Sequence, residues 1–408
     1  MRRRVAVTGM GGVTALGEDW GAIRARFARG ETGVRRMDEW DRFHGINTRL
    51  GAPVIGFDVE SRYERRLLRG MGPVARMAVY ATERALADAG LLGDPELSRG
   101  RVGIAYGSSF GSHKPVLAFA ELMERGASNR LSGTSYVQMM SHTAAVNIGL
   151  MFAVRGRIIP TSSACTSGSQ GIGYAYEAIR HGFQDVMIAG GAEELYPTDA
   201  AVFDTLFATS TRNDAPGTTP RPFDRDRDGL VIGEGAATLV LEEWARARAR
   251  GARVHAEVVG FGTNSDGNHI TQPAAETMET ALRLALEDSG LPPAAIGCVN
   301  AHGTATDWGD VAEARATAAV FGASVPVHAL KSYFGHSLGA CGSIEAWLGI
   351  EMMKEAWFAP TANLDNVDDK CAGLDHIMGA ARRIEIEHLM SNNFAFGGIN
   401  TSLIFRRV

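Results

Sequence analysis

Apolar residues form short runs along the chain, and these runs alternate with longer stretches in which apolar positions recur every three to four residues. The short runs, such as 5–11, 102–109 and 235–243, have the length of buried strands. The longer stretches, such as those ending at residues 91 and 291, have the spacing of amphipathic helices. Strands that alternate with helices predict a largely parallel sheet covered by helices.

The same order of elements occurs twice. A helical stretch ending in ALADAGL (85–91) has a counterpart ending in ALEDSGL (285–291), and each leads into a short strand that ends at a Gly-Ser or Gly-Thr step. Three further pairs are VAVTGMG (5–11) with EVVGFG (257–262), 102–109 with 296–305, and GAATLVLEE (235–243) with INTSLIFRR (399–407). We therefore predict two duplicated halves, each built on its own sheet.

An Arg-rich amphipathic helix over 242–250 connects the two halves. We expect the first half to span residues 1–250 and the second 251–408. Two halves also fit the length of 408 residues, which exceeds the roughly 250–300 residues over which one core usually grows. The segment 211–229 interrupts the pattern because it is long and rich in Pro, Gly, Asp and Arg, and such loops are usually functional.

The glycines in the first strand of each half raise the alternative of a dinucleotide-binding turn. Gly9 and Gly11 begin such a pattern, but Thr14 stands where a third Gly or Ala is required. The same departure recurs in the second half at 260–265. Close packing of the strand against a helix is the better interpretation.

The composition is that of an ordinary globular protein, with 45% hydrophobic and 21% charged residues. A net charge of −5 is small for this length and argues against a nucleic-acid partner. The sequence has no run of about 18 apolar residues, so we expect no membrane span, and its glycine-interrupted start predicts a strand rather than a signal peptide. Four cysteines without a CxxC pair predict reduced thiols and a cytoplasmic protein.

Cys165 lies in TSSACTSGSQGIGYAYEAIRHG (161–182), just before small residues and a helical run. Because a helix N-terminus lowers the pKa of a nearby thiol, this position favours a thiolate nucleophile. The alternative is a buried, unreactive core cysteine, which is the commoner fate of a lone cysteine. The segment alone leaves both interpretations open.

Two histidines stand at predicted strand ends in the second half. His302 lies in NAHGTATDWGDVAEA (300–314) and His336 in KSYFGHSLGACGSIEAWLG (331–349). Either histidine alone is more often structural than catalytic. Because the repeat brings strand ends of both halves together, where sites in such sheets usually lie, we expect both histidines in one site. No Cys and His pair has the short spacing of zinc sites, which argues against zinc.

A lysine and a glycine-rich turn extend the candidate site. Lys331 is one of four lysines among 41 basic residues, which suggests a position that needs a compact ammonium. In SNNFAFGGINTSLIF (391–405), a polar turn, two aromatic residues and Gly397–Gly398 precede the last predicted strand. This turn either faces a ligand or forms a β-bulge, and the residues favour neither.

Taken in order, the ACTSG, NAHGT, KSYFGHSLGACG and NFAFGGIN segments resemble the β-ketoacyl-acyl-carrier-protein synthases I and II of the thiolase superfamily. The resemblance spans nearly the whole chain. It implies an α/β fold, a thiolase-like five-layered αβαβα sandwich from two duplicated halves, assembled as a homodimer. It also implies decarboxylative Claisen condensation of an acyl thioester with malonyl-acyl-carrier protein, in fatty-acid or related aryl polyene or polyketide biosynthesis. No cofactor is required, and acyl carrier protein is the expected partner.

The resemblance further implies roles for individual residues. Cys165 would be the nucleophile, His302 and His336 the paired imidazoles, and Lys331 the ammonium that orders the site. Backbone N–H groups of Cys165 and Phe396 would form the oxyanion hole, and Phe396 would also be the gate residue of its loop. The supporting carboxylates match Asp310, Glu313 and Glu345. Some relatives hold a monovalent cation, Na⁺ or K⁺, at positions matching Asn300, Glu345, Ser391 and Asn392.

The sequence departs from the family pattern at two places. Phe110, in GSSFGS (107–112), stands where elongating relatives commonly carry a smaller side chain lining the acyl pocket, so we expect a shortened or reshaped pocket. Tyr333 and Phe334 replace the usual Met and Thr, as in synthases of specialised pathways.

Because the family's carrier protein is acidic, arginines are candidate docking contacts. These are Arg62, Arg65, Arg66, Arg69 and Arg212.

Two other functions are weighed against condensation. A thiolase or starter-type synthase pairs its cysteine with His plus Cys or with His plus Asn, whereas this chain has a second His in GHSLGACG. A non-elongating partner subunit, like a chain-length factor, would be a scaffold without catalysis. The presence of Cys165 and both histidines argues against the scaffold.

Overall fold

The computed structural model describes residues 2–408, and its main sheet contains the same strand arrangement twice. The first set is β1 (Val5–Thr14), β4 (Val102–Gly107), β5 (Ile158–Thr161), β6 (Val186–Glu193) and β8 (Gly235–Glu243). The second is β9 (Ala256–Ser265), β10 (Ile296–Asn300), β11 (Pro326–His328), β13 (Asp375–His376), β15 (His388–Phe394) and β16 (Ile399–Arg406).

The strand order shows the duplication directly. The first half has the order β1-β8-β6-β4-β5 and the second β9-β16-β15-β10-β11, with β13 added at the edge; β1 pairs with β9 where the halves meet. In each half, the two pairings nearest the junction are antiparallel and the remaining ones are parallel. The β1–β9 pairing joins the two half-sheets, called here the first and second sheet, into one 11-stranded sheet. Each is mixed rather than largely parallel, because the strands over 235–243 and 399–406 run against both neighbours.

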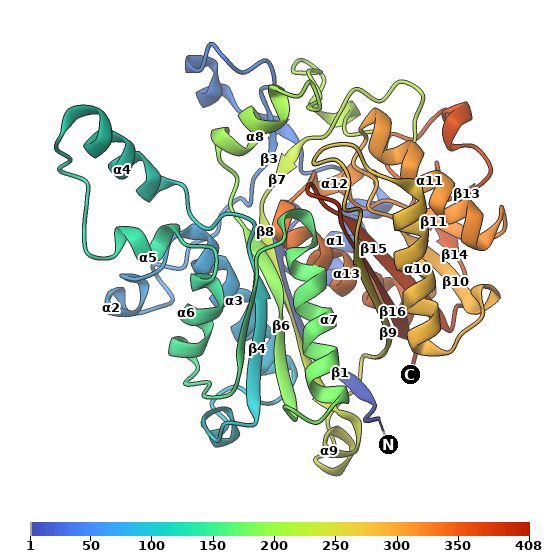
Figure 1. The fold of residues 1–408 in the computed structure, drawn as a ribbon, viewed down its shortest axis with the longest axis horizontal. Coiled ribbons are helices and arrows are strands. Elements are labelled where there is room, and N and C mark those ends of the chain that lie inside the picture. Colours follow the sequence, from blue (N-terminus) through green and yellow to red (C-terminus); the bar gives the residue numbers. More distant parts are fainter. Residues whose placement is uncertain (1) are drawn as a thin grey trace.

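Helices and sheets alternate in five layers, three of helices and two of strands (Figure 1). Helices α3 (Pro73–Asp88) and α6 (Thr143–Met151) cover the outer face of the first sheet. Helices α10 (Ala275–Ser289) and α11 (Asp307–Phe321) cover the outer face of the second. Between the sheets lie α7 (Ser167–Arg180) and α13 (Cys341–Glu355), which pack on each other.

The other regular elements connect or decorate these layers. The helices are α1 (Trp20–Ala28), α2 (Arg65–Leu68), α4 (Lys114–Arg125), α5 (Ser135–Met139), α8 (Pro197–Asp204), α9 (Trp244–Ala249) and α12 (Lys331–Phe334). The strands are β2 (Arg35–Arg36), β3 (Leu50–Ala52), β7 (Ile232–Gly233), β12 (Trp357–Phe358) and β14 (Arg382–Arg383).

The glycines in the first strand of each half allow close contact with a helix. A Cβ at Gly9 would stand 2.2 Å from the carbonyl oxygen of Ala85 in α3. A Cβ at Gly262 would stand 2.2 Å from the carbonyl oxygen of Ala281 in α10. Such distances exclude a side chain, so the preference for strand-to-helix packing over a dinucleotide turn is confirmed.

The connection between the halves differs in detail from the sequence prediction. Residues 242–243 complete β8, so the helix predicted over 242–250 is the shorter α9. The carboxylate of Glu243 accepts hydrogen bonds from the N–H groups of Ala245 and Arg246 and thereby starts this helix. One hydrophobic cluster includes residues of both halves, so the boundary at residue 250 stays a prediction.

Among residues 2–408, no helix combines the length and apolar character needed to span a bilayer.

The duplicated topology brings three chain segments to one place. After β5 the chain reaches Cys165 at the start of α7, and after β11 it reaches Lys331 and His336 ahead of α13. After β10 it reaches His302. The N-terminal ends of the two central helices therefore face the carboxyl end of β10, and the turn between β15 and β16 lies beside them.

Candidate active site

Cys165 lies in a 3₁₀ turn (Ala164–Thr166) directly before α7, with 4% of its surface exposed. The N–H groups of Cys165 and Phe396 contact its thiol, and Nε2 of His336 lies 3.0 Å from Sγ. Burial raises the pKa of the thiol to about 11, although the Lys331 ammonium opposes this. The sequence prediction of a lowered pKa is therefore wrong, because burial outweighs the neighbouring positive charge.

His336 is a neutral hydrogen-bond donor towards the thiol. Its Nδ1 accepts the backbone N–H of Leu338 at 3.2 Å, so the ring proton resides on Nε2. Burial, together with the nearby Lys331 ammonium, holds the pKa of His336 well below its usual range. The Nε2–H therefore points at the Cys165 sulfur without adding a charge.

His302 is fixed in the same tautomer by different partners. Its Nδ1 lies 3.1 Å from Nζ of Lys331 and 3.4 Å from the Nδ2 amide of Asn393, both of which are donors. The proton of His302 is therefore on Nε2. Burial and the Lys331 charge hold the pKa of His302 well below its usual range. The two imidazole rings stand perpendicular, with centroids 5.2 Å apart.

Lys331 is a buried ammonium with a defined counterion. Its Nζ donates to Oε1 of Glu345 at 2.5 Å, and the other Glu345 oxygen accepts the Asn393 amide at 2.7 Å. Burial opposes the charge on Lys331, but Cys341 and Glu345 raise its pKa overall. The ammonium therefore stays charged and keeps Nδ1 of His302 an acceptor.

Cys165, His302 and His336 also form a group whose ligand atoms all lie within 4.8 Å of one another. The sequence contains no short-range Cys and His spacing for this group, because its members come from three separate segments. Both Nδ1 atoms accept hydrogen bonds, so both Nε2 atoms carry protons and offer no lone pair to a metal ion. The hydrogen bonds thus favour proton donation over zinc binding.

Two carboxylates hold the backbone turn that carries His302. Glu313 accepts the N–H groups of His302 at 2.7 Å and Gly303 at 2.8 Å. Asp310 accepts the N–H groups of Phe223 at 2.7 Å and Ala305 at 3.1 Å. Burial raises the pKa of Glu313 to about 8 and that of Asp310 to about 6.

The site contains three residues that the sequence did not single out: Glu193, Cys341 and Asn393. Glu193 accepts the N–H groups of Ser109 and Gly339, and burial raises its pKa to about 7. The Cys341 thiol donates to the carbonyl of Cys165 at 3.2 Å. Glu193 and Glu194 directly follow the apolar run VMIAGGA, and two acids at the end of a buried strand were a usable signal.

A cavity of about 300 Å³ is lined by Cys165 and both imidazoles. It extends to Leu206, Ile270 and Trp308, whose side chains are exposed. Ala395, Phe396 and Gly398 of the glycine-rich turn line it as well, which supports a ligand-facing turn over a β-bulge. The Phe396 ring packs on Phe203, with centroids 4.9 Å apart.

Of the four positions matched to a cation in relatives, Asn300, Ser391 and Asn392 could still bind an ion, whereas Glu345 is already paired. Asn300 donates to the Ser391 hydroxyl at 3.1 Å. The buried Oδ1 atoms of Asn300 and Asn392 have no hydrogen-bond partner within residues 2–408. Such oxygens fit a monovalent cation. Glu345 instead binds Lys331, so its carboxylate already has a counterion.

Phe110 does not line the cavity that contains Cys165. Its ring is 45% exposed and stacks on His113, with centroids 4.3 Å apart. The His113 ring is buried, and its two nitrogens lie 3.0 Å from Glu194 and 2.9 Å from Asp199. In the single chain Phe110 therefore points outward because His113 holds its ring, and its role in an acyl pocket stays a prediction.

The remaining predicted residues also lie outside the cavity lining. Tyr333 and Phe334 are fully buried, and the Tyr333 ring packs on Phe27 at 4.4 Å, so they shape the core. The candidate docking arginines lie in or beside α2 or in the 211–229 loop. Of these, Arg66 pairs with Glu64 at 2.6 Å and Arg212 with Asp228 at 3.3 Å.

A five-layered αβαβα sandwich with a buried cysteine and two histidines at the helix ends defines a thiolase-like acyltransferase. Residues 2–247 match the family model "Beta-ketoacyl synthase, N-terminal domain", and residues 255–365 match the corresponding C-terminal domain. The chain belongs to the β-ketoacyl synthase family. This confirms the resemblance and the thiolase-like fold predicted from the motifs.

Individual relatives cover the whole chain. It is 39% identical over 420 residues to 3-oxoacyl-[acyl-carrier-protein] synthase 2 of Vibrio cholerae, with 100% of each chain covered. The crystal structure of a β-ketoacyl synthase from Burkholderia phymatum is 61% identical, with a TM-score of 0.98 and full coverage of both chains. A type II polyketide ketosynthase in complex with its acyl carrier protein, AntDE:AntF, is 28% identical over full coverage, with a TM-score of 0.87.

Proposed function

We propose that this acyltransferase condenses an acyl group held on Cys165 with malonyl-acyl-carrier protein, releasing CO₂ and a 3-oxoacyl thioester. The observation that supports this most is the convergence on one sulfur of two backbone N–H groups and an imidazole Nε2–H. A second imidazole with its proton on Nε2 lies beside them. Such an arrangement can stabilise two negatively charged oxygens in one reaction, first the oxyanion of acyl transfer and then the enolate formed by decarboxylation.

The first step is acyl transfer from the carrier thiol to Cys165. The sulfur attacks the thioester carbonyl, the carrier sulfur leaves, and the thiol proton of Cys165 ends on the released carrier thiol. The N–H groups of Cys165 and Phe396 stabilise the tetrahedral oxyanion, which is worth about 3 kcal/mol per well-placed donor in a buried site. The covalent intermediate divides one difficult step into two easier ones.

The second step is loss of CO₂ from the malonyl thioester. Its C–C bond breaks, and the electron pair forms an enolate whose oxygen accepts the Nε2–H groups of His302 and His336. The enolate carbon then attacks the acyl thioester, the C–S bond breaks, and the Cys165 thiolate leaves and takes up a proton from water. Because both imidazoles are neutral donors, they stabilise the enolate without transferring a proton.

Intact-mass measurement after mixing the protein with acyl-carrier and malonyl-carrier protein tests this reaction. We expect one CO₂ for each 3-oxoacyl-carrier product, two carbons longer than the donor acyl group. Wild-type protein that released CO₂ without forming product, or that formed neither, would exclude condensation. The thiolase and scaffold alternatives are not favoured, because the site has two histidines and a cysteine that lines the cavity.

The proposed partner is an acyl carrier protein, as in the AntDE:AntF complex. Its arm would enter past the apolar side chains of Leu206, Ile270 and Trp308. The predicted arginine contacts would add charge-dependent steering towards an acidic carrier. Steering predicts that KM for the carrier substrate rises with salt. The Arg65 side chain is exposed. In an Arg65→Ala variant, KM for the carrier substrate should therefore depend less on salt than in the wild type.

We also propose a homodimer formed through the β5 edge of the sheet. Strand β5 is an outermost strand, and its Ile158 is exposed. Leu150 in α6 and Met123 in α4 are 75% and 84% exposed, and helices α4 and α5 project from the body in Figure 1. Sedimentation of the wild type and of Leu150→Glu tests this proposal. A wild-type monomer would contradict it.

Four broader predictions belong to the same proposal. The pathway would be fatty-acid biosynthesis or a related aryl polyene or polyketide pathway, and the location would be the cytoplasm. The reaction would need no cofactor. A Na⁺ or K⁺ ion at Asn300, Ser391 and Asn392 would have a structural role, which changes in thermal stability with each salt would detect.

A further inference from the structure

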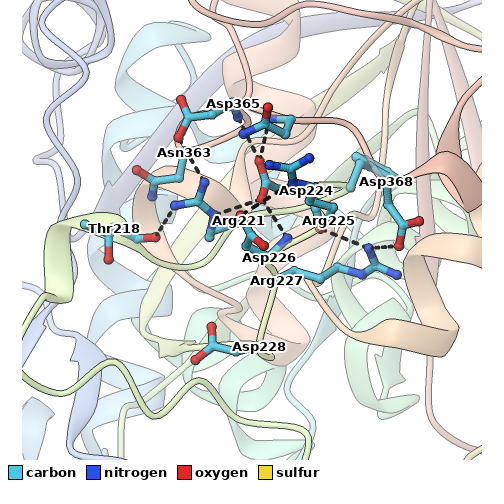
Figure 2. Close-up of polar contacts among 12 residues, drawn as sticks. Thr218, Arg221, Asp224, Arg225, Asp226, Arg227, Asp228, Asn363, Asp365 and Asp368 are labelled. Carbon is cyan, nitrogen blue, oxygen red and sulfur yellow. Dashed lines mark hydrogen bonds and ion pairs between the residues drawn. The ribbon is translucent and has the colours of Figure 1, made fainter.

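The loop 218–229 is held in place by a network of charged side chains, of which Arg221, Asp224 and Arg227 are buried (Figure 2). Asp224 accepts the backbone N–H groups of Asp365 and Asn366, each at 2.8 Å, and the Nε of Arg221 at 3.2 Å. Arg221 in turn donates to the Asp365 carboxylate at 2.9 Å. The loop is therefore tied to the segment 363–368 rather than mobile on the surface.

Arg227 connects this network to the turn that follows His302. Its side chain is 2% exposed, and Nη1 donates to the Asp368 carboxylate at 2.6 Å, a contact visible in Figure 2, and to the carbonyl of Asp224 at 3.0 Å. Its Nε and Nη2 donate to the carbonyls of Thr306 and Asp307, both at 3.3 Å. The guanidinium thus spans two segments with four hydrogen bonds.

The turn over 303–307 has a backbone that needs such support. Gly303 has a φ of 44°, and Ala305 has a φ of 65°, a left-handed conformation that costs a residue with a side chain roughly 1–2 kcal/mol. The N–H of Ala305 is held by Asp310, and its carbonyl accepts the N–H of Gly229 at 3.1 Å. Strained backbone of this kind persists only when its surroundings hold it.

The turn serves the reaction at both of its ends. His302 precedes it, and Thr304, Thr306 and Trp308 line the cavity that contains Cys165. A shift of the turn would move the wall against which a thioester arm binds. It would also change the direction of the His302 Nε2–H.

We propose that Arg227 is a positioning residue, whose guanidinium fixes the turn 303–308 so that its wall receives the thioester arm and His302 faces the enolate. Arg227 touches no substrate in this arrangement and acts through the carbonyls of Thr306 and Asp307. The proposal rests on the role given to His302 under the proposed function.

The charge of Arg227 gives this arrangement a measurable signature. Its Nε lies 3.8 Å from the buried carboxylate of Asp310, which otherwise faces Glu313 and Cys371. Burial raises the pKa of Asp310 to about 6, and Arg227 lowers it. Without the guanidinium, the Asp310 pKa would rise further, so a larger fraction of Asp310 would be protonated at neutral pH, and the protonated oxygen would accept its backbone N–H less well. The acid limb of the activity profile would then move to higher pH.

Steady-state kinetics of malonyl-carrier decarboxylation in three variants test the proposal. Arg227→Met removes both charge and hydrogen bonds, and Arg227→Lys retains the charge alone. Arg225→Met is the matched control, because Arg225 lies in the same loop but is exposed, and among residues 2–408 its guanidinium pairs only with Asp226, at 3.8 Å. We expect Arg227→Met to raise KM about tenfold, lower kcat about tenfold and shift the acid limb upward, since a small misplacement slows an enzyme by up to 10².

We expect Arg227→Lys to restore the pH profile but not the full KM, and Arg225→Met to match the wild type. Alkylation of Cys165 by iodoacetamide should proceed at one rate in all folded variants, because the thiol itself is not displaced. Unchanged KM, kcat and pH profile in a folded Arg227→Met protein with a lowered Tm would show a merely structural role and overturn the proposal.

Asp368→Asn covers the case in which Arg227→Met does not fold. This change removes the negative charge of the carboxylate that accepts from Arg227 and leaves Arg227 itself in place. We therefore expect KM for malonyl-carrier protein to rise less than in Arg227→Met. No rise in KM would overturn the proposal. A wild-type protein without decarboxylation would instead contradict the proposed function, so the two failures are distinguishable.

Discussion

Removal of single side chains should separate the two half-reactions, because different donors stabilise their two negative charges. In Cys165→Ala the nucleophile is lost, but both imidazole Nε2–H groups remain, so condensation stops while malonyl decarboxylation continues. In His336→Ala one of the two enolate donors is lost. His336 and His302 are 2% and 6% exposed, so water cannot easily replace either donor.

The magnitude follows from this burial. Loss of one preorganised donor in a water-excluded site costs about 3 kcal/mol, which corresponds to a decrease in rate of roughly 10²–10³. We therefore expect His336→Ala to decarboxylate malonyl-carrier protein at least a hundredfold more slowly than Cys165→Ala. Cys298→Ala is the control, since Cys298 is a buried free cysteine in the core and lies outside the cavity lining.

The assay combines CO₂ release with intact-mass detection of the acylated protein, and circular dichroism checks that each variant is folded. His336→Ala should still become acylated, because the N–H groups of Cys165 and Phe396 remain in place. Equal loss of decarboxylation in Cys165→Ala and His336→Ala would refute this division between the donors.

Three further predictions concern stability and pocket shape. Burial lowers the pKa of His113, but the carboxylates of Asp199 and Glu194 outweigh burial and raise the pKa from 6.5 to about 9. The protonated ring therefore stabilises the folded protein. This contribution is complete below pH 6.5 and is lost as the pH rises through 9. Between pH 6 and 10, chemical unfolding should therefore show the wild type losing about 3 kcal/mol more than His113→Gln; equal losses would contradict this. Lys331→Met should lower the free energy of unfolding by about 3–5 kcal/mol, because it leaves Glu345 buried without its cation. Adding Glu345→Met should recover stability but not decarboxylation, and recovery of both would show that the ammonium has no role in the site. Phe110 does not line the cavity of the single chain, so Phe110→Ala tests the pocket role that the resemblance implies: the variant should extend use of saturated acyl donors from C6 towards C16 in a chain-length assay, and full use of C16 by the wild type would remove the basis for a shortened pocket.

The sequence was informative where one pattern occurred twice. Gly9 and Gly262 occupy equivalent strands because each must pass close to a helix carbonyl, and this constraint is visible in the residues themselves. The motifs around Cys165, His302 and His336 were also recognisable, since each combines a reactive side chain with small residues at a strand end. The structure brings all three together as expected.

Other properties depend on contacts that no local pattern contains. The direction of the Cys165 pKa shift was mispredicted, because it is set by how completely the two halves bury the thiol. The partners of Asn393 and Glu193 lie far away in the chain, so sequence spacing does not reveal those contacts, although the acid at 193 was visible at a strand end. The outward position of Phe110 likewise depends on His113, whose ring is held by carboxylates of another segment.

Peptide mass mapping after incubation with an acyl-carrier protein tests most directly whether Cys165 is the nucleophile. The nearest competing thiol is Cys341, which donates to the carbonyl of Cys165 at 3.2 Å, so the two sites must be resolved separately. We predict an acyl adduct on Cys165 that disappears when malonyl-carrier protein is added. An adduct on Cys341, or none on either cysteine, would contradict the central role given to Cys165.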